Sequence, residues 1–300
     1  MTVLPFVDAH IHLWDLTHLR YPWLSPPFDD SGPNGSVEPI ARNFGVADYR
    51  ALMARWNVVG AVHIDAGAHA DDALAETEWL EGQGDVLPNG IVAFAALDHP
   101  SIDAQLAAQA AHARVRGIRH IVNWHADARR SYTVRDLTQD AQWQAGFATL
   151  ARHGLSFDLQ CYPGQMPGLV PLLARHPEVP VMINHLGMPV LSDADGVADW
   201  RAGMTALAGL PHVAVKISGF GFIRRDWSLA DVAPFVREAI DLFGPDRCMM
   251  ASDVPTDLLF ADIDRCMEAL HAVVADHAEA DRRAMFARNA NRLYRLELPL

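Results

Sequence analysis

Cysteine is scarce in this chain of 300 residues, and the few that occur exclude two kinds of stabilising site. Cys161, Cys248 and Cys266 are odd in number and lie far apart in the sequence. They form neither the closely paired spacing of a zinc ribbon nor a disulfide framework. We therefore expect a protein of a reducing compartment, with the cytoplasm as the default location.

Long apolar runs and basic clusters are missing as well. No apolar run is long enough to span a membrane, and the N-terminus lacks the basic region and apolar stretch of a signal peptide. The formal net charge is −13 and no run of lysine and arginine occurs, so nucleic acid is not expected as a partner. We predict a small-molecule substrate and no membrane partner, and a homo-oligomer stays open.

Three motifs that would indicate other chemistries are absent. No GxGxxG turn follows the first expected strand, which disfavours an open sheet that binds a dinucleotide. No Walker loop occurs, and Ser218 does not lie in the GxSxG turn of a serine hydrolase. The sequence also shows no internal repeat and no low-complexity linker, so we expect one domain over residues 1–300.

Short apolar runs alternate with stretches of helical periodicity along the whole chain. Eight runs predict strands: Pro5–His10, Val58–Asp65, Gly90–Leu97, Val115–Val122, Leu155–Cys161, Val179–Asn184, Val213–Ile217 and Arg247–Ser252. The helices expected around them are Val46–Trp56, Asp71–Leu80, Ile102–Arg114, Asp140–His153, Pro167–His176, Val197–Leu207, Leu229–Phe243, Leu258–His277 and Asp281–Tyr294. Eight strand-and-helix units of this length predict a single-domain (β/α)₈ TIM barrel of the α/β class, with an open doubly wound sheet as the alternative.

One segment, residues 13–45, departs from this pattern. It is rich in proline, contains aromatic residues such as Trp14 and Trp23, and shows no clear periodicity. A loop of this length inside a compact domain is usually functional. Because it follows the first strand at the end where barrels build their sites, we predict that it covers the mouth of an active site.

Polar residues occur where the expected strands end, and a barrel brings these ends together. His10 and His12 are two residues apart in the first strand, so alternation places both rings on one face, together with Asp8. Further polar residues at strand ends are His63, Asp65, His120, Asp158, Gln160, Tyr162, His185, Lys216, Ser218 and Asp253. Three imidazoles and a carboxylate, His10, His12, His185 and Asp253, suit a divalent metal ion such as zinc. Asp253 also suits the role of a general base.

Several longer motifs resemble the amidohydrolase superfamily, and more narrowly its amidohydrolase-2, TIM-barrel lactonase branch. They are DAHIH at 8–12, FDLQCYPGQ at 157–165, NHLGMP at 184–189, VKISG at 215–219, PDRCMMASDVPTD at 245–257 and RNANRLYRLE at 288–297. The resemblance extends over essentially the whole chain. It implies a hydrolase that opens lactones of sugar acids or of aromatic catabolism, in which His10, His12 and His185 match metal-site or carbonyl-polarising histidines and Asp253 matches the general base.

The chain departs from many amidohydrolases at two strands. The fourth strand offers His120 where a lysine or glutamate would bridge two metals, and the fifth offers Asp158 and Gln160 in place of a histidine. We therefore expect one divalent metal ion, with zinc as the preferred candidate. The alternative is that the imidazoles act directly on the carbonyl without a metal. The predicted substrate contacts are Trp14, His63, His120, Gln160, Tyr162, Lys216 and Arg224. A metal-dependent decarboxylase of an aromatic acid and a non-enzymatic metal-binding barrel remain competing interpretations.

Overall fold

The protein is a (β/α)₈ barrel, as the alternation of strands and helices predicts. The computed structural model describes residues 4–28, 30–84 and 87–300. In that part of the chain eight parallel strands pair in sequence order: β1 (Phe6–Ile11), β2 (Val58–Ile64), β3 (Gly90–Phe94), β4 (Val115–Arg119), β5 (Ser156–Leu159), β6 (Val181–Ile183), β7 (Val213–Ile217) and β8 (Cys248–Met250). Beyond β8 the ring closes on β1, where the His12 N–H donates to the Val254 carbonyl at 2.8 Å and the Asp253 N–H donates to the His10 carbonyl at 2.9 Å.

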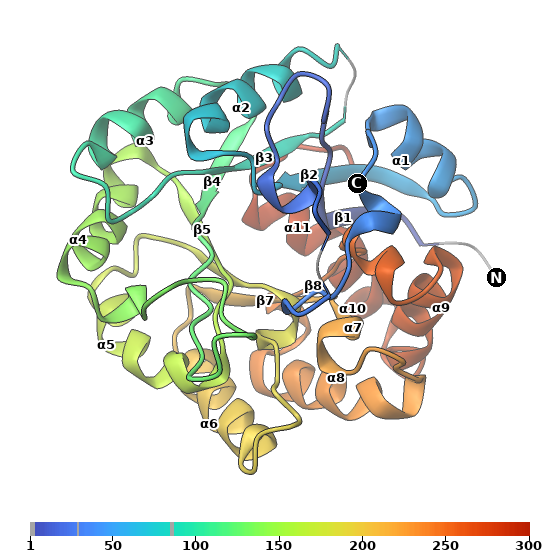
Figure 1. Ribbon diagram of the computed structural model, residues 1–300. Coiled ribbons are helices and arrows are strands. Elements are labelled where there is room, and N and C mark those ends of the chain that lie inside the picture. Colours follow the sequence, from blue (N-terminus) through green and yellow to red (C-terminus); the bar gives the residue numbers. More distant parts are fainter. Residues whose placement is uncertain (1–3, 29, 85–86) are drawn as a thin grey trace.

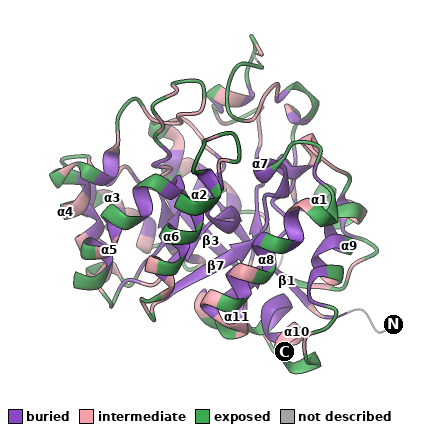
Figure 2. Ribbon diagram, turned by 90° about the horizontal axis from the view of Figure 1, so that it is seen from below, coloured by how far each residue is buried: buried purple, intermediate pink, exposed green. Residues whose placement is uncertain are grey.

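Helices form a ring outside the strands (Figure 1). Their bounds are α1 (Val46–Leu52), α2 (Ala73–Glu81), α3 (Ile102–Ala110), α4 (Ala141–Thr149), α5 (Met166–Arg175), α6 (Gly196–Ala208), α7 (Phe220–Ile223), α8 (Leu229–Phe243), α9 (Ile263–Val273), α10 (Glu279–Arg283) and α11 (Asn289–Leu293). Buried residues fill the strands and the inner helix faces, while exposed residues lie on the outer faces (Figure 2). No helix in the described ranges has both the length and the apolar character needed to cross a membrane.

Side-chain capping explains where several helices begin. Asp140 accepts from the N–H groups of Gln142 and Trp143 at the start of α4, and Asp262 accepts from the Arg265 N–H at the start of α9. The sequence predicted one helix from Leu258 to His277, and that prediction is wrong at its start. Because Asp262 takes the cap position, the preceding residues Thr256–Leu259 form a separate 3₁₀ turn.

The end of the chain closes the bottom of the barrel. Ala287, Ala290 and Tyr294 pack against inward side chains such as Val7 and Met249. The Tyr294 hydroxyl reaches the barrel interior, where it lies 3.0 Å from both carboxylate oxygens of Asp158. The opposite end of the barrel, at the carboxyl ends of the strands, is where an active site is expected.

Candidate active site

Asp253 lies three residues after the end of β8, among the carboxyl ends of the strands. Its backbone has a φ of 56°, a left-handed conformation that a non-glycine residue adopts only at a cost in energy. The side chain is 1% exposed, and neither carboxylate oxygen has a hydrogen-bond partner among the described residues. Burial raises the pKa of this carboxyl well above its ordinary value, although the nearby cations Arg119 and Lys216 act in the opposite direction. A buried, unpartnered carboxylate of this kind needs a proton or a cation.

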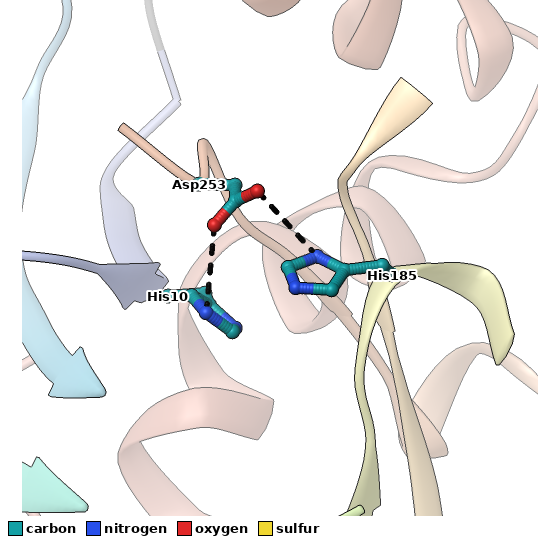
Figure 3. A group of neighbouring side chains, drawn as sticks. All are labelled: His10, His185 and Asp253. Atoms are coloured by element: carbon teal, nitrogen blue, oxygen red, sulfur yellow. Dashed lines mark ion pairs between the residues drawn. The ribbon is translucent and has the colours of Figure 1, made fainter. Parts of the chain in front are cut away.

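Three imidazoles surround this carboxylate. The Nε2 atoms of His10 and His12 lie 3.5 and 3.3 Å from Asp253 Oδ1, and His185 Nδ1 lies 3.8 Å from Asp253 Oδ2. Figure 3 shows His10 from β1 and His185 from the end of β6 on either side of Asp253. The four residues that the sequence predicted as a set thus come together from three distant parts of the chain.

Each ring also contacts a neighbouring group that helps to orient it. His12 Nδ1 lies 2.8 Å from the Ile64 carbonyl, which can only accept, so Nδ1 carries the proton and the Nε2 lone pair faces the site. His185 Nδ1 lies 3.0 Å from the Ser218 hydroxyl, and His10 Nδ1 lies 3.4 Å from Lys216 Nζ.

The surroundings of the three rings favour their neutral form. Burial lowers the pKa of each imidazole well below its ordinary value. Lys216 adds to the effect at His10, and Arg119 adds to it at His12 and His185. Neutral imidazoles with free lone pairs are the form that binds a metal ion.

The donor set fits a divalent cation. One ligand atom from each of His10, His185 and Asp253 lies within 4.8 Å of the others, and all three residues are buried. His12 adjoins this group, because its Nε2 is 3.2 Å from His10 Nε2. Two imidazole nitrogens so close require a proton or a cation between them.

A register shift, rather than plain alternation, orients the first strand. Between Asp8 and Ile11 β1 advances three residues while β2 advances two, from Ala61 to His63. The prediction that Asp8 shares a face with His10 is therefore wrong. Asp8 turns outwards and accepts hydrogen bonds from the hydroxyl groups of Tyr49 and Ser252, whereas His10 turns towards Lys216. Asp8 thereby holds the residue next to Asp253.

A cavity of about 250 Å³ opens above the four residues. We call it the inner cavity, and its walls are His12, Trp23, Asn34, Ala66, Gly67, Arg119, Ile121, Tyr132, Gln160, His185, Phe222, Asp253 and Thr256. Trp23 and Asn34 belong to segment 13–45. The described part of this segment contains two 3₁₀ turns, Pro22–Leu24, which includes Trp23, and Glu38–Ile40. That this segment covers a bound substrate stays a prediction.

Two of the predicted substrate contacts lie at or below this cavity. Gln160 lines it and accepts a hydrogen bond from Arg119 at 3.1 Å. Lys216 lies deeper, paired with Asp158, and burial lowers the pKa of its ammonium group to about 8. We interpret Lys216 as a support of His10, since it is not among the residues that line the cavity.

Three other predicted contacts lie outside the inner cavity. Trp14 donates from its indole N–H to the Arg42 carbonyl at 2.6 Å and packs against Trp23. His63 turns towards α2 and accepts from the Leu13 N–H at 3.1 Å. His120 turns away from the barrel interior, stacks edge-on against Phe94 and accepts from the Leu97 N–H at 3.1 Å.

The last two predicted contacts lie further out. Tyr162 and Arg224 line a neighbouring cavity. The Tyr162 hydroxyl donates a hydrogen bond to the Arg130 carbonyl at 2.7 Å.

Sequence reasoning missed Arg119, the cation of the inner cavity. It is buried at the end of β4, where it contacts Asp65 and Gln160. In the sequence VRGIRH the alternation of faces could have indicated it, because Arg119 and His120 must face opposite sides of the strand. Asn34 and Tyr132 were also missed and come from loops, and Phe222 belongs to the one-turn helix α7; such segments carry no such periodicity.

Comparison with known proteins identifies the family. The sequence pattern of the family described as amidohydrolase matches residues 7–296. The chain belongs to this family. It is similar to y4mH of Sinorhizobium fredii, an uncharacterized protein, with 37% identity over 99% of this chain and 100% of the relative. It is 27% identical to an L-fucono-1,5-lactonase of Burkholderia multivorans, over 98% of this chain and 97% of that enzyme.

A solved structure agrees with this assignment. A zinc-bound amidohydrolase from Burkholderia multivorans matches with a TM-score of 0.80 and 27% identity, covering 98% of this chain and 99% of the other. The resemblance to the amidohydrolase superfamily and its lactonase branch is thus confirmed, and the protein is an enzyme.

Proposed function

We propose that this amidohydrolase opens the ring of a sugar lactone by adding water to its carbonyl carbon. The observation that carries the proposal is the Asp253 carboxylate, which is buried, has no hydrogen-bond partner among the described residues and faces the inner cavity beside three imidazoles. A carboxylate with a raised pKa is suited to accept a proton from water and to return it.

The walls of the inner cavity favour a small, neutral, hydroxyl-rich substrate. Arg119, Gln160, Asn34 and Tyr132 offer donors and acceptors around the space, and Trp23 and Phe222 offer apolar surface. The charge of Arg119 is offset by Asp65, 3.4 Å away, so the cavity has no unpaired cation for a substrate carboxylate. The similarity to an L-fucono-1,5-lactonase supports the same class of substrate.

A divalent metal ion, with zinc as the preferred candidate, completes the proposed site. His10, His12, His185 and Asp253 would hold it, and three histidines with one carboxylate are a ligand set that zinc accepts. The zinc-bound structure of the similar amidohydrolase supports this assignment. When bound, such an ion would polarise the lactone carbonyl and lower the pKa of a water molecule.

The chain's own groups account for the proton transfers. Asp253 takes a proton from the attacking water as the oxygen–carbon bond forms. The ring carbon–oxygen bond then breaks, and Asp253 returns the proton to the departing alkoxide. Arg119 and Gln160, on neighbouring strand ends, would hold the ring hydroxyls so that the carbonyl carbon faces Asp253.

The experiment is a substrate panel with product analysis. Purified enzyme is offered aldono-1,5-lactones, including L-fucono-1,5-lactone, and muconolactones, while acid release is followed by a pH indicator. A parallel set of aromatic acids is analysed for carbon dioxide. We expect hydroxy acid from at least one sugar lactone. Carbon dioxide from an aromatic acid, with every lactone left intact, would establish the decarboxylase instead.

A further inference from the structure

A second cavity adjoins the inner one on the side of the loops. We call it the outer cavity; it has a volume of about 530 Å³. Its walls are Pro33, Arg130, Tyr132, Tyr162, Met188, Pro189, Val190, Leu191, Ser192, Gly221, Phe222, Ile223, Arg224, Arg225 and Phe260. Tyr132 and Phe222 line both cavities, so the two spaces adjoin at these residues.

The charge of the outer cavity is opposite to that of the protein. The chain has a formal net charge of −13, yet Arg130, Arg224 and Arg225 line this space and no aspartate or glutamate is among its lining residues. A concave surface lined by one sign of charge concentrates ions of the other sign. The outer cavity therefore attracts anions.

Of the three arginines that line the outer cavity, Arg225 is the one without a carboxylate partner among the described residues. Arg130 is paired with Asp193 at 3.0 Å, and Arg224 is paired with Asp226 at 3.1 Å. Within the described ranges Arg225 forms no ion pair with a carboxylate. One of its N–H groups donates to the Asn34 carbonyl at 3.0 Å, and its guanidinium lies 5.2 Å from the centre of the Phe260 ring.

This guanidinium lies close to the backbone of Gly35. Gly35 has a φ of +66°, and a Cβ at that position would lie 2.7 Å from an Arg225 nitrogen. The neighbouring Asn34 side chain accepts from the Tyr132 hydroxyl at 2.7 Å. Arg225 thus contacts the Asn34–Gly35 segment, of which Asn34 lines the inner cavity, and it has further N–H donors for a ligand.

The proposed reaction creates an anion where none existed. A neutral lactone takes up water, its ring carbon–oxygen bond breaks, and the resulting hydroxy acid loses a proton to give a carboxylate at neutral pH. Among the described residues that line the inner cavity, the cationic side chain of Arg119 is already offset by Asp65, whereas the adjoining outer cavity is lined by Arg225. Resting on the proposed function, we propose that the outer cavity binds the carboxylate of the opened sugar acid, with Arg225 as its anion-binding residue.

Binding of a charged and an uncharged sugar derivative tests this proposal. L-Fuconate carries the carboxylate, and L-fucitol is a polyol of the same length without it. By titration calorimetry we expect the wild-type enzyme to bind L-fuconate about tenfold more tightly than L-fucitol or better, the effect of one charge-assisted hydrogen-bonded contact.

The substitution Arg225→Gln should remove most of that preference, and Arg225→Lys should keep part of it because the charge remains. Arg201→Gln is the matched control, since Arg201 is an arginine of α6 that pairs with Glu238 on the helical surface. An unchanged preference in Arg225→Gln, or no preference in the wild-type enzyme, would overturn the proposal. Thermal unfolding of each variant shows whether the fold is retained.

Lactone turnover, measured on the same wild-type sample, separates this inference from the proposed function. Turnover without any preference for L-fuconate leaves the lactonase assignment intact and refutes the anion site. Absence of turnover on every sugar lactone refutes the lactonase assignment, while the Arg225 titrations still decide whether the outer cavity binds a carboxylate.

Discussion

The inner and outer cavities differ in what builds them and in how their charges are arranged. The chemical groups of the inner cavity come from strand ends, are buried, and are held by partners such as Ile64, Ser218 and Asp8. The outer cavity is built largely by loops, and its Arg225 is exposed and forms no ion pair with a carboxylate in the described part of the chain. The groups assigned to the reaction thus lie on strand ends, and loops form the surface for which we propose ligand binding.

Removal of the metal should have the largest effect on the inner cavity. Dialysis against a chelator is expected to lower turnover about a hundredfold or more, because polarisation by a metal ion contributes several kcal/mol to such reactions. Added zinc should restore turnover, and elemental analysis should find about one zinc per chain. Full activity of a metal-free sample would instead favour imidazoles that act on the carbonyl directly.

Gly219 tests whether the position of His185 matters. Its φ is +67°, and a Cβ there would lie 2.6 Å from the Cβ of His185. We expect Gly219→Ala to lower turnover about tenfold or more, because small displacements in a site of this kind are costly.

Gly154→Ala is the matched control for this substitution. Gly154 has a similar φ of +64°, but no atom lies within 4 Å of its added Cβ. Both variants should lose about 1 kcal/mol of unfolding free energy through backbone strain, and only Gly219→Ala should lose turnover. Equal turnover in the two variants would show that the position of His185 does not limit the reaction.

The smallest expected difference is between Arg119, the last residue of β4, and His120, which follows it. Arg119 faces the inner cavity and His120 faces away from it. Arg119→Gln should raise KM for a sugar lactone about tenfold, the effect of losing one charged hydrogen bond. His120→Asn, which keeps an acceptor for the Leu97 N–H, should change KM by less than about twofold. A larger effect at His120 would restore it as a substrate contact.

The sequence alone could predict the barrel and the central set of residues, for a physical reason. Buried parallel strands read as apolar runs, and polar residues at their ends converge, so His10, His12, His185 and Asp253 could be placed together. The face of Asp8 could not be predicted, because a register shift in β1 depends on pairing with β2. The alternation of faces along the fourth strand could have predicted that Arg119 turns inwards. Asn34 and Arg225 could not be placed, because they lie in loops whose paths depend on tertiary contacts.

The central claim is that Asp253 transfers the protons of lactone opening, and the rate of Asp253→Asn tests it most directly. The substitution removes a buried charge that has no hydrogen-bond partner among the described residues, so the fold and thermal stability should be retained. Turnover of the best lactone at saturating metal should fall by about 10²–10⁴-fold, the usual contribution of a general base. A folded Asp253→Asn enzyme with wild-type turnover would contradict the claim.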